Sequence, residues 1–186
     1  AAHLAPRAPL RIRVWKGLAP GSGLGSSAAS AAAAAFAAAT LLDLDTDPQS
    51  LVAAAAEGER ASAGAPHADN VSAALFGGLT CVAGPVFSWH IPEYVAFALA
   101  VPRLELTTKA MRRVVPKIWP RAVHTRETAR AVATAFMLVR GELARLDEVI
   151  GNSVVERRRS RLIPGYDAVV AAARHAGAPA VTISGS

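Results

Sequence analysis

The pattern of apolar and polar positions predicts a strand, a glycine-rich turn and a helix in the first forty or so residues. In residues 10–15 aliphatic side chains alternate with arginine and tryptophan, which is the period-two pattern of a strand with one buried face. The turn occupies residues 20–25. An alanine-rich segment then begins at Ser26 and Ser27 and predicts a helix to about Leu42, because alanine has the highest helix propensity. We therefore expect a strand–turn–helix unit here.

Strands and helices are predicted in separate stretches further along the chain. Asp47-Pro48 favours the start of a helix over residues 49–60. Gly64 and Pro66 predict a loop over residues 62–70, and a short helix should end at Gly77. Apolar runs predict strands at 79–83, 86–90, 94–101 and 180–184. Helical patterns lie at 107–115, 121–145, 146–159 and 165–175. This separation predicts an α+β fold in which helices cover a sheet.

Composition indicates a globular protein without disulfides. The chain has 186 residues, of which 52% are hydrophobic, so it can bury a core and is not disordered. Cys81 is the single cysteine, and we expect it to be a small buried hydrophobe. No apolar stretch approaches the ~20 residues of a membrane span, and no signal peptide is visible. We expect a cytoplasmic protein with no membrane partner, or a plastid one if a transit peptide precedes the chain.

The charge balance predicts an affinity for anions. Twenty basic and 14 acidic residues give a net charge of +6, which attracts anionic ligands. Aromatic residues make up only 5% of the chain and are not interleaved with the basic ones, so no stacking platform for nucleic acid is evident and we expect no nucleic-acid partner. The arginine cluster at 157–161 forms either a solvated helical face or part of an anion pocket.

The glycine-rich turn carries the most specific chemistry. Gly21, Gly23 and Gly25 permit positive φ angles and a close approach of the backbone to a ligand. The N-terminus of the following helix adds free N–H groups and the positive end of its dipole, so the unit is suited to a di- or triphosphate. Ser26 and Ser27 add hydroxyls that can reach phosphate or bound magnesium. Neither a Walker loop nor the G-x-G-x-x-G dinucleotide motif fits the spacing.

Residues 21–29, Gly-Ser-Gly-Leu-Gly-Ser-Ser-Ala-Ala, resemble the ATP-binding motif of the GHMP kinases. The family usually places its proline one position earlier, where this chain has Ala19. The resemblance implies a GHMP-kinase-like fold with a two-layer sheet covered by helices, and it implies ATP and Mg²⁺ as cofactors. It assigns ATP binding to Pro20, Gly21, Ser22, Gly23, Leu24, Gly25, Ser26, Ser27 and Ala28.

Further stretches look like the homoserine kinases in particular. They lie at 58–71, at 76–78, at 107–109 with Arg112, at 162–165 and at 182–185. This resemblance implies transfer of the γ-phosphoryl of ATP to the hydroxyl of L-homoserine, in threonine biosynthesis, and is compatible with a homodimer. The alternatives are a GHMP kinase for another small alcohol, such as shikimate or mevalonate, and a nucleotide-binding relative without catalysis.

The resemblance also implies a division of the chain into two parts. Residues 1–90 correspond to the C-terminal part of the ATP-binding domain, and residues 91–186 to the first part of the C-terminal domain. Related kinases are longer, so we expect the fold to be truncated at both ends, with a third glycine-rich motif that begins at Ser184-Gly185-Ser186 and is cut off there. We also expect residues 1–186 alone to have little or no activity.

The candidate substrate residues follow from the chemistry of an amino acid. Arg112 and Arg159 can bind a carboxylate bidentately, although a neighbouring arginine of the cluster could take the place of Arg159. His67, Asp69 and Asn70 can bind the ammonium and hydroxyl groups, with Asp69 and Asn70 as alternatives for orienting the hydroxyl.

The resemblance adds two assignments to this set. It places Thr108 in the substrate pocket with Arg112 and Arg159, and it assigns Ser27 and Glu59 to magnesium. Glu59, Asp69 and Asn70 are therefore the candidate catalytic residues. His67 could instead be a structural histidine, and Glu59 a surface residue at the end of its helix.

Overall fold

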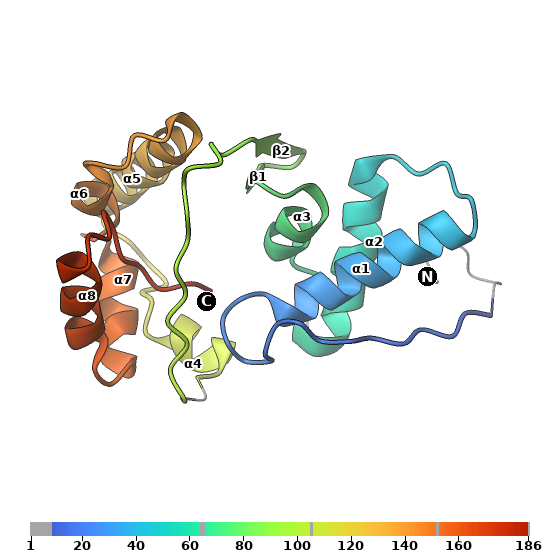
Figure 1. Ribbon diagram of the computed structural model, residues 1–186, viewed down its shortest axis with the longest axis horizontal. Helices are drawn as coiled ribbons and strands as arrows, with labels where there is room; N and C mark the ends of the chain where they lie inside the picture. The colour runs from blue at the N-terminus through green and yellow to red at the C-terminus, as the bar shows by residue number, and fades with distance from the viewer. Residues whose placement is uncertain (1–8, 64–65, 105, 152, 186) are drawn as a thin grey trace. The chain divides into compact units, whose positions relative to one another are not determined.

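The computed structural model describes residues 9–63, 66–104, 106–151 and 153–185. The chain divides into two compact units, Ala1–His90 and Ile91–Ser186, and each is described by itself. Helices and a small antiparallel sheet together make up the fold (Figure 1), so the prediction of a mixed α+β fold is confirmed. Within the described residues no helix combines the length and apolar character needed to cross a membrane.

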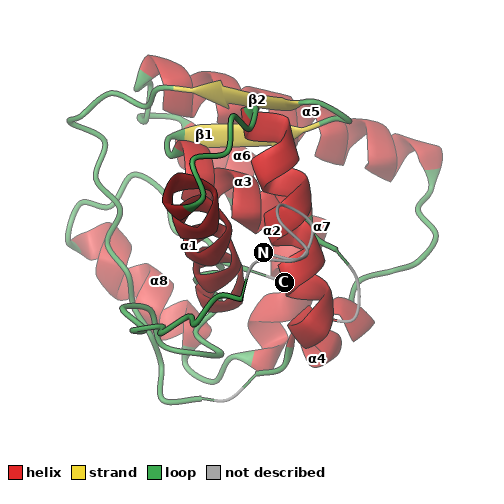
Figure 2. Ribbon diagram, turned by 90° about the vertical axis from the view of Figure 1, so that its right-hand side faces the viewer, coloured by secondary structure: helices red, strands yellow, loops and turns green. Residues whose placement is uncertain are grey.

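The first unit is built on three helices and a hairpin. Helix α1 (Ser26–Leu41), α2 (Pro48–Ala63) and α3 (Ala68–Phe76) contact one another, and the strands β1 (Leu79–Val82) and β2 (Val86–Trp89) follow α3 (Figure 2). The strands pair antiparallel, with Leu79 opposite Trp89. The carboxylate of Asp47 caps α2 by accepting from the backbone N–H groups of Gln49 and Ser50 at 2.9 and 3.1 Å.

Small side chains allow α1 and α2 to pack closely. The buried face of α1 consists largely of alanines at helical spacing: Ala28, Ala32, Ala35, Ala38 and Ala39. A Cβ added to Gly58 of α2 would lie 3.3 Å from the Cβ of Ala31, close enough that Ala31 would have to move by a few tenths of an ångström. Val52, Ala55 and Val71 complete the core from α2 and α3. The core therefore positions the N-terminus of α1 against the other two helices.

The second unit is mostly helical among its described residues. Its helices are α4 (Thr108–Arg113), α5 (Arg121–Arg140), α6 (Leu146–Ile150), α7 (Val154–Arg159) and α8 (Tyr166–His175), with a 3₁₀ turn at Ser160–Leu162. Helix α5 ends earlier than predicted because Gly141 adopts a left-handed conformation (φ 67°). The predicted helix over 146–159 is two helices, and the hydroxyl of Ser153 caps the second by accepting from the N–H of Val155 at 3.2 Å.

Three of the predicted strands are wrong. Residues 10–15, 94–101 and 180–184 form no strand. Ile12, Tyr94 and Phe97 are 53%, 71% and 66% exposed, rather than buried in a sheet. An apolar run can favour an extended backbone, but a strand also needs a neighbour for its N–H and C=O groups, and none of the described segments pairs with these three.

Two further expectations need correction. Cys81 lies in β1 as predicted, but it is exposed, because a two-stranded hairpin leaves one of its faces open. The predicted loop over 62–70 is mostly helix: α2 continues to Ala63, and α3 begins at Ala68, so Asp69 and Asn70 stand in its first turn. An aspartate there is favourable because it faces the positive end of the helix dipole. Gly64 and Ala65, like Ser186, lie outside the described residues.

Candidate active site

The glycine-rich turn adopts the conformation that its composition predicts. Gly21, Gly23 and Gly25 have φ angles of 75°, 77° and 70°, in the left-handed region that favours glycine. Gly25 directly precedes α1, so the turn leads into the free N–H groups of the helix. A Cβ added to Gly21 would meet no atom within 4 Å. The turn therefore has the open backbone surface that a polyphosphate requires.

Side chains of the turn hold its two ends together. The Ser26 hydroxyl is buried and donates to the Leu18 carbonyl at 2.8 Å, while the Lys16 ammonium donates to the Ser26 carbonyl at 3.0 Å. The Ser22 hydroxyl donates to the Ala19 carbonyl at 2.7 Å. Thus the hydroxyls of Ser22 and Ser26 donate to carbonyls of the two residues just before the turn. Ser27 is exposed. This contact of Lys16 was not predicted, because a lone lysine before a turn does not indicate a functional role.

The residues around the start of α3 meet this turn. The side chain of Asn70 lies against Gly25: a Cβ built on the glycine would be 3.4 Å from both Cγ and Oδ1 of Asn70. Asp69 accepts a hydrogen bond from the N–H of Asn70 at 2.8 Å, and both side chains are exposed. His67 precedes α3 with an extended backbone and is half-buried. The structure therefore brings Asn70 to the proposed phosphate site.

Glu59 is buried rather than at the surface. It is 6% exposed on α2, next to Gly58, where α2 meets α1 at Ala31. Ser27 lies one turn earlier on α1. In the described ranges no three His, Cys, Asp or Glu side chains form a metal-binding group. Mg²⁺ is commonly bound through one or two carboxylates together with substrate phosphates, so the oxygen donors of Ser27 and Glu59 fit this ion.

The second unit presents Thr108 and Arg112 on one helix. The two residues stand four apart on α4 and are both exposed, and this spacing places them on the same face. The Thr107 hydroxyl caps the helix by accepting from the N–H of Ala110 at 3.2 Å. Met111, in the same helix, is buried and anchors it. Thr108 and Arg112 are thus held on a short, anchored helix.

Arg159 lies within electrostatic range of Arg112. The pKa of Arg159 is lowered, first because the group is partly desolvated and second because the positive charge of Arg112 repels it, while Glu156 acts in the opposite direction. Its Nη1 donates to the carbonyl of Gly185 at 3.0 Å. Its Nε–H is buried and has no hydrogen-bond partner within the described part of the chain. Two mutually repelling guanidinium groups are a favourable place for a carboxylate.

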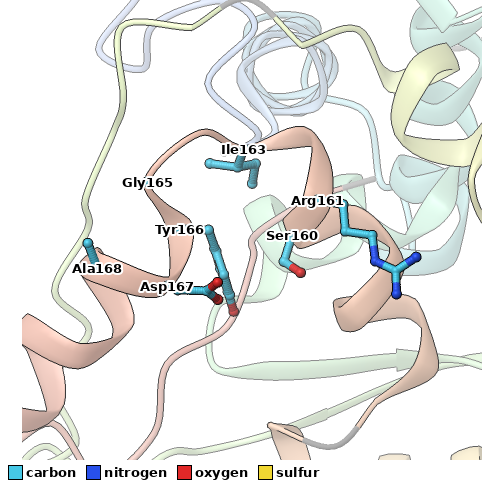
Figure 3. A pocket seen from close by; sticks show the side chains of 7 residues that line it. All are labelled: Ser160, Arg161, Ile163, Gly165, Tyr166, Asp167 and Ala168. Atoms are coloured by element: carbon cyan, nitrogen blue, oxygen red, sulfur yellow. The ribbon is translucent and has the colours of Figure 1, made fainter.

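Glu156 and Tyr166 were not predicted to take part in this region. Glu156 is buried on α7 and accepts hydrogen bonds from Tyr166, Thr182 and Ile183. The available signal in the sequence was a glutamate between two valines and the arginine cluster, three residues before Arg159. A pocket of about 240 Å³ lies beside Tyr166 (Figure 3). Arg161 of the arginine cluster borders it, but Arg159 and the other individually predicted site residues do not. The pocket is lined by Ser160, Arg161, Ile163, Gly165, Tyr166, Asp167 and Ala168.

Comparison with known proteins shows which proteins this chain is similar to. Residues 1–78 match the N-terminal domain of the GHMP kinases. Over 179 residues the chain is 41% identical to the homoserine kinase of Halobacterium salinarum, and the alignment covers 96% of this chain and 59% of the relative. The homoserine kinase of Methanocella arvoryzae is 38% identical over 187 residues, with 98% and 61% covered.

A solved structure agrees with these sequence relatives. The crystal structure of homoserine kinase from Cytophaga hutchinsonii superimposes with a TM-score of 0.79 at 32% identity, covering 91% of this chain and 55% of that one. The chain is therefore similar to the GHMP kinases, the superfamily that the glycine motif predicted. Within that superfamily the proteins it resembles here are homoserine kinases. The chain spans about three fifths of the length of these curated relatives.

Proposed function

We propose that the protein to which this chain belongs is a homoserine kinase, which transfers the γ-phosphoryl group of ATP to the hydroxyl of L-homoserine. The observation that carries the proposal is the identity of about 40% to homoserine kinases over nearly the whole chain, because it includes both units and not only the nucleotide motif. The product would be O-phospho-L-homoserine, an intermediate of threonine biosynthesis.

In this proposal the first unit binds the nucleotide. The backbone N–H groups of the turn from Pro20 to Gly25 and of the first residues of α1 surround the phosphates, where the helix dipole favours negative charge. The hydroxyl of Ser27 and the carboxylate of Glu59 hold Mg²⁺, which neutralises phosphate charge when it is bound. The hydrogen bonds of Lys16 and Ser26 hold the two ends of the turn together.

The acceptor substrate is bound through its three functional groups. Arg112 and Arg159 bind the carboxylate, with Thr108 beside Arg112 on α4, and the repulsion between the two guanidinium groups is relieved by the bound anion. His67 and Asp69 bind the ammonium group. Asn70 orients the hydroxyl of homoserine, because its side chain lies against Gly25, the last residue of the turn before α1.

The chemistry depends on positioning and charge neutralisation. Phosphoryl transfer proceeds in line through a loose transition state, so the enzyme has little covalent work to do. The hydroxyl of homoserine attacks the γ-phosphorus, the bond to the β-phosphate oxygen breaks, and the hydroxyl proton passes to phosphate or to water. Asp69 is not required as a base in this scheme, since it is exposed and its carboxylate already accepts from Asn70.

The test is phosphorylation by the full-length protein with ATP and Mg²⁺, with product identity as the readout. L-Homoserine, shikimate, mevalonate and galactose are offered in parallel. We expect phosphohomoserine to form with by far the highest kcat/KM. Preferential phosphorylation of another alcohol would reassign the substrate within the superfamily, and nucleotide binding without turnover of any acceptor would indicate a non-catalytic relative.

A further inference from the structure

Glu156 is a buried carboxylate to which the proposed reaction assigns no role. It lies on α7, is 9% exposed and precedes Arg159 by three residues. Burying an ionised carboxylate is costly unless it is paired or hydrogen-bonded. The contacts of Glu156 therefore indicate what its burial accomplishes.

Glu156 collects donors from two distant segments. Its Oε2 accepts from the hydroxyl of Thr182 at 2.9 Å, and its Oε1 accepts from the N–H of Ile183 at 3.0 Å. The hydroxyl of Tyr166, at the start of α8, also donates to Oε1. Burial of this phenol and its bond to the carboxylate raise the pKa of Tyr166, so Tyr166 remains a donor at neutral pH. One side chain thus joins α7, α8 and the segment that follows α8.

The same segment supports Arg159. The guanidinium of Arg159 donates to the carbonyl of Gly185 at 3.0 Å, two residues beyond the N–H that Glu156 holds at Ile183. The negative charge of Glu156 also attracts Arg159 and opposes the repulsion from Arg112. Glu156 therefore acts on Arg159 in two ways, through its charge and through the acceptor that it keeps in place.

We propose that Glu156 is a positioning residue that holds the guanidinium of Arg159 beside Arg112, in the orientation that receives the substrate carboxylate. This inference rests on the proposed function. Without the carboxylate of Glu156, the segment from Thr182 to Gly185 is released. The repulsion between Arg112 and Arg159 is then no longer opposed. The affinity for the amino-acid substrate should then fall while nucleotide binding, which belongs to the first unit, is unaffected.

The test begins with Glu156→Gln in the full-length protein, which removes the charge and nearly preserves the shape. We expect the KM for homoserine to rise about tenfold, the usual effect of losing hydrogen bonds to a charged group, with the KM for ATP unchanged. Glu156→Asp keeps the charge and should recover part of the loss. Asp147→Asn is the matched control, since Asp147 pairs with Arg174 at 2.6 Å in the same unit, and it should leave both KM values unchanged.

A double-mutant cycle decides whether Glu156 acts through Arg159. If it does, Glu156→Gln should cause no further rise in the homoserine KM when Arg159 is already alanine. An equal rise in both backgrounds would overturn the inference, as would a change of both KM values together with a lowered melting temperature, which is the signature of a merely structural role.

Two further results keep the inference falsifiable. If Glu156→Gln does not fold, Tyr166→Phe removes one donor and leaves the charge, and it should raise the homoserine KM about two- to threefold; no rise would count against the inference. If the wild-type protein phosphorylates another alcohol, the proposed function itself has failed, and the inference fails with it. Failure of the inference alone shows in the variants while the wild type remains active on homoserine.

Discussion

The side chain of Asn70, in the first turn of α3, lies against Gly25, the left-handed residue that precedes α1. The two positions are 45 residues apart in the sequence. Because Gly25 has φ 70°, a side chain there would be strained by its backbone, and its Cβ would stand in van der Waals contact with Cγ and Oδ1 of Asn70, at 3.4 Å. The contact connects the proposed nucleotide turn to the residues proposed for the acceptor hydroxyl.

Gly25→Ala should destabilise the protein by about 1–2 kcal/mol, the cost of a left-handed conformation for a residue with a Cβ. It should also raise the KM for ATP, since the turn is displaced from α1. Chemical denaturation and steady-state kinetics measure the two effects. Gly17→Ala is the control, because a Cβ at Gly17 meets nothing within 4 Å and its φ is not positive. Equal behaviour of the two variants would argue against a special role for Gly25.

Asn70→Ala should lower kcat by about 10²-fold, the scale of losing the orientation of a reacting group, with little change in stability because the side chain is exposed. Asp69→Asn keeps the size of the neighbouring side chain and should cost much less. Rapid-quench measurement of the chemical step distinguishes the two. A larger loss in Asp69→Asn, together with a lost limb in the pH profile of kcat, would identify Asp69 as a general base.

Glu59→Gln should raise the Mg²⁺ concentration needed for half-maximal activity by at least about tenfold, since even indirect disturbance of a metal site costs this much. The matched control is Glu57→Gln on the same helix, because Glu57 pairs with Arg60 at the surface at 2.8 Å. Titration of activity with Mg²⁺ at saturating ATP provides the comparison. An unchanged Mg²⁺ requirement in Glu59→Gln would remove Glu59 from the metal site.

Tyr166 predicts a pH dependence of stability. Its pKa is raised in the folded protein by burial and by Glu156, so the folded state favours the protonated phenol. The stability it contributes is fully present below the unfolded pKa of about 10 and is lost progressively as the pH rises above that value. The difference in free energy of unfolding between wild type and Tyr166→Phe should be constant from about pH 7 to 9 and should shrink at higher pH. A constant difference up to about pH 11.5 would contradict the buried hydrogen bond.

Features encoded over a few residues were predicted well. The start of α1, the helix start after Asp47 and the two strands on either side of Gly84 and Pro85 depend on backbone preferences of the residues involved. These preferences are visible in the sequence. The resemblance to the GHMP kinases rested on the same kind of local signal. The strands expected at 94–101 and 180–184 failed because pairing needs a second segment, which no local pattern specifies.

The sequence by itself determined the conformation of the glycine turn and the resemblance to the GHMP kinases, because glycine content and residue order act locally. Only the tertiary structure decided that Glu59 is buried, that Asn70 touches Gly25, and that Glu156 joins Tyr166 to Thr182 and Ile183. Burial and hydrogen bonding depend on which distant segments meet. The free energy of a polar side chain is therefore set by neighbours that its own stretch of sequence does not contain.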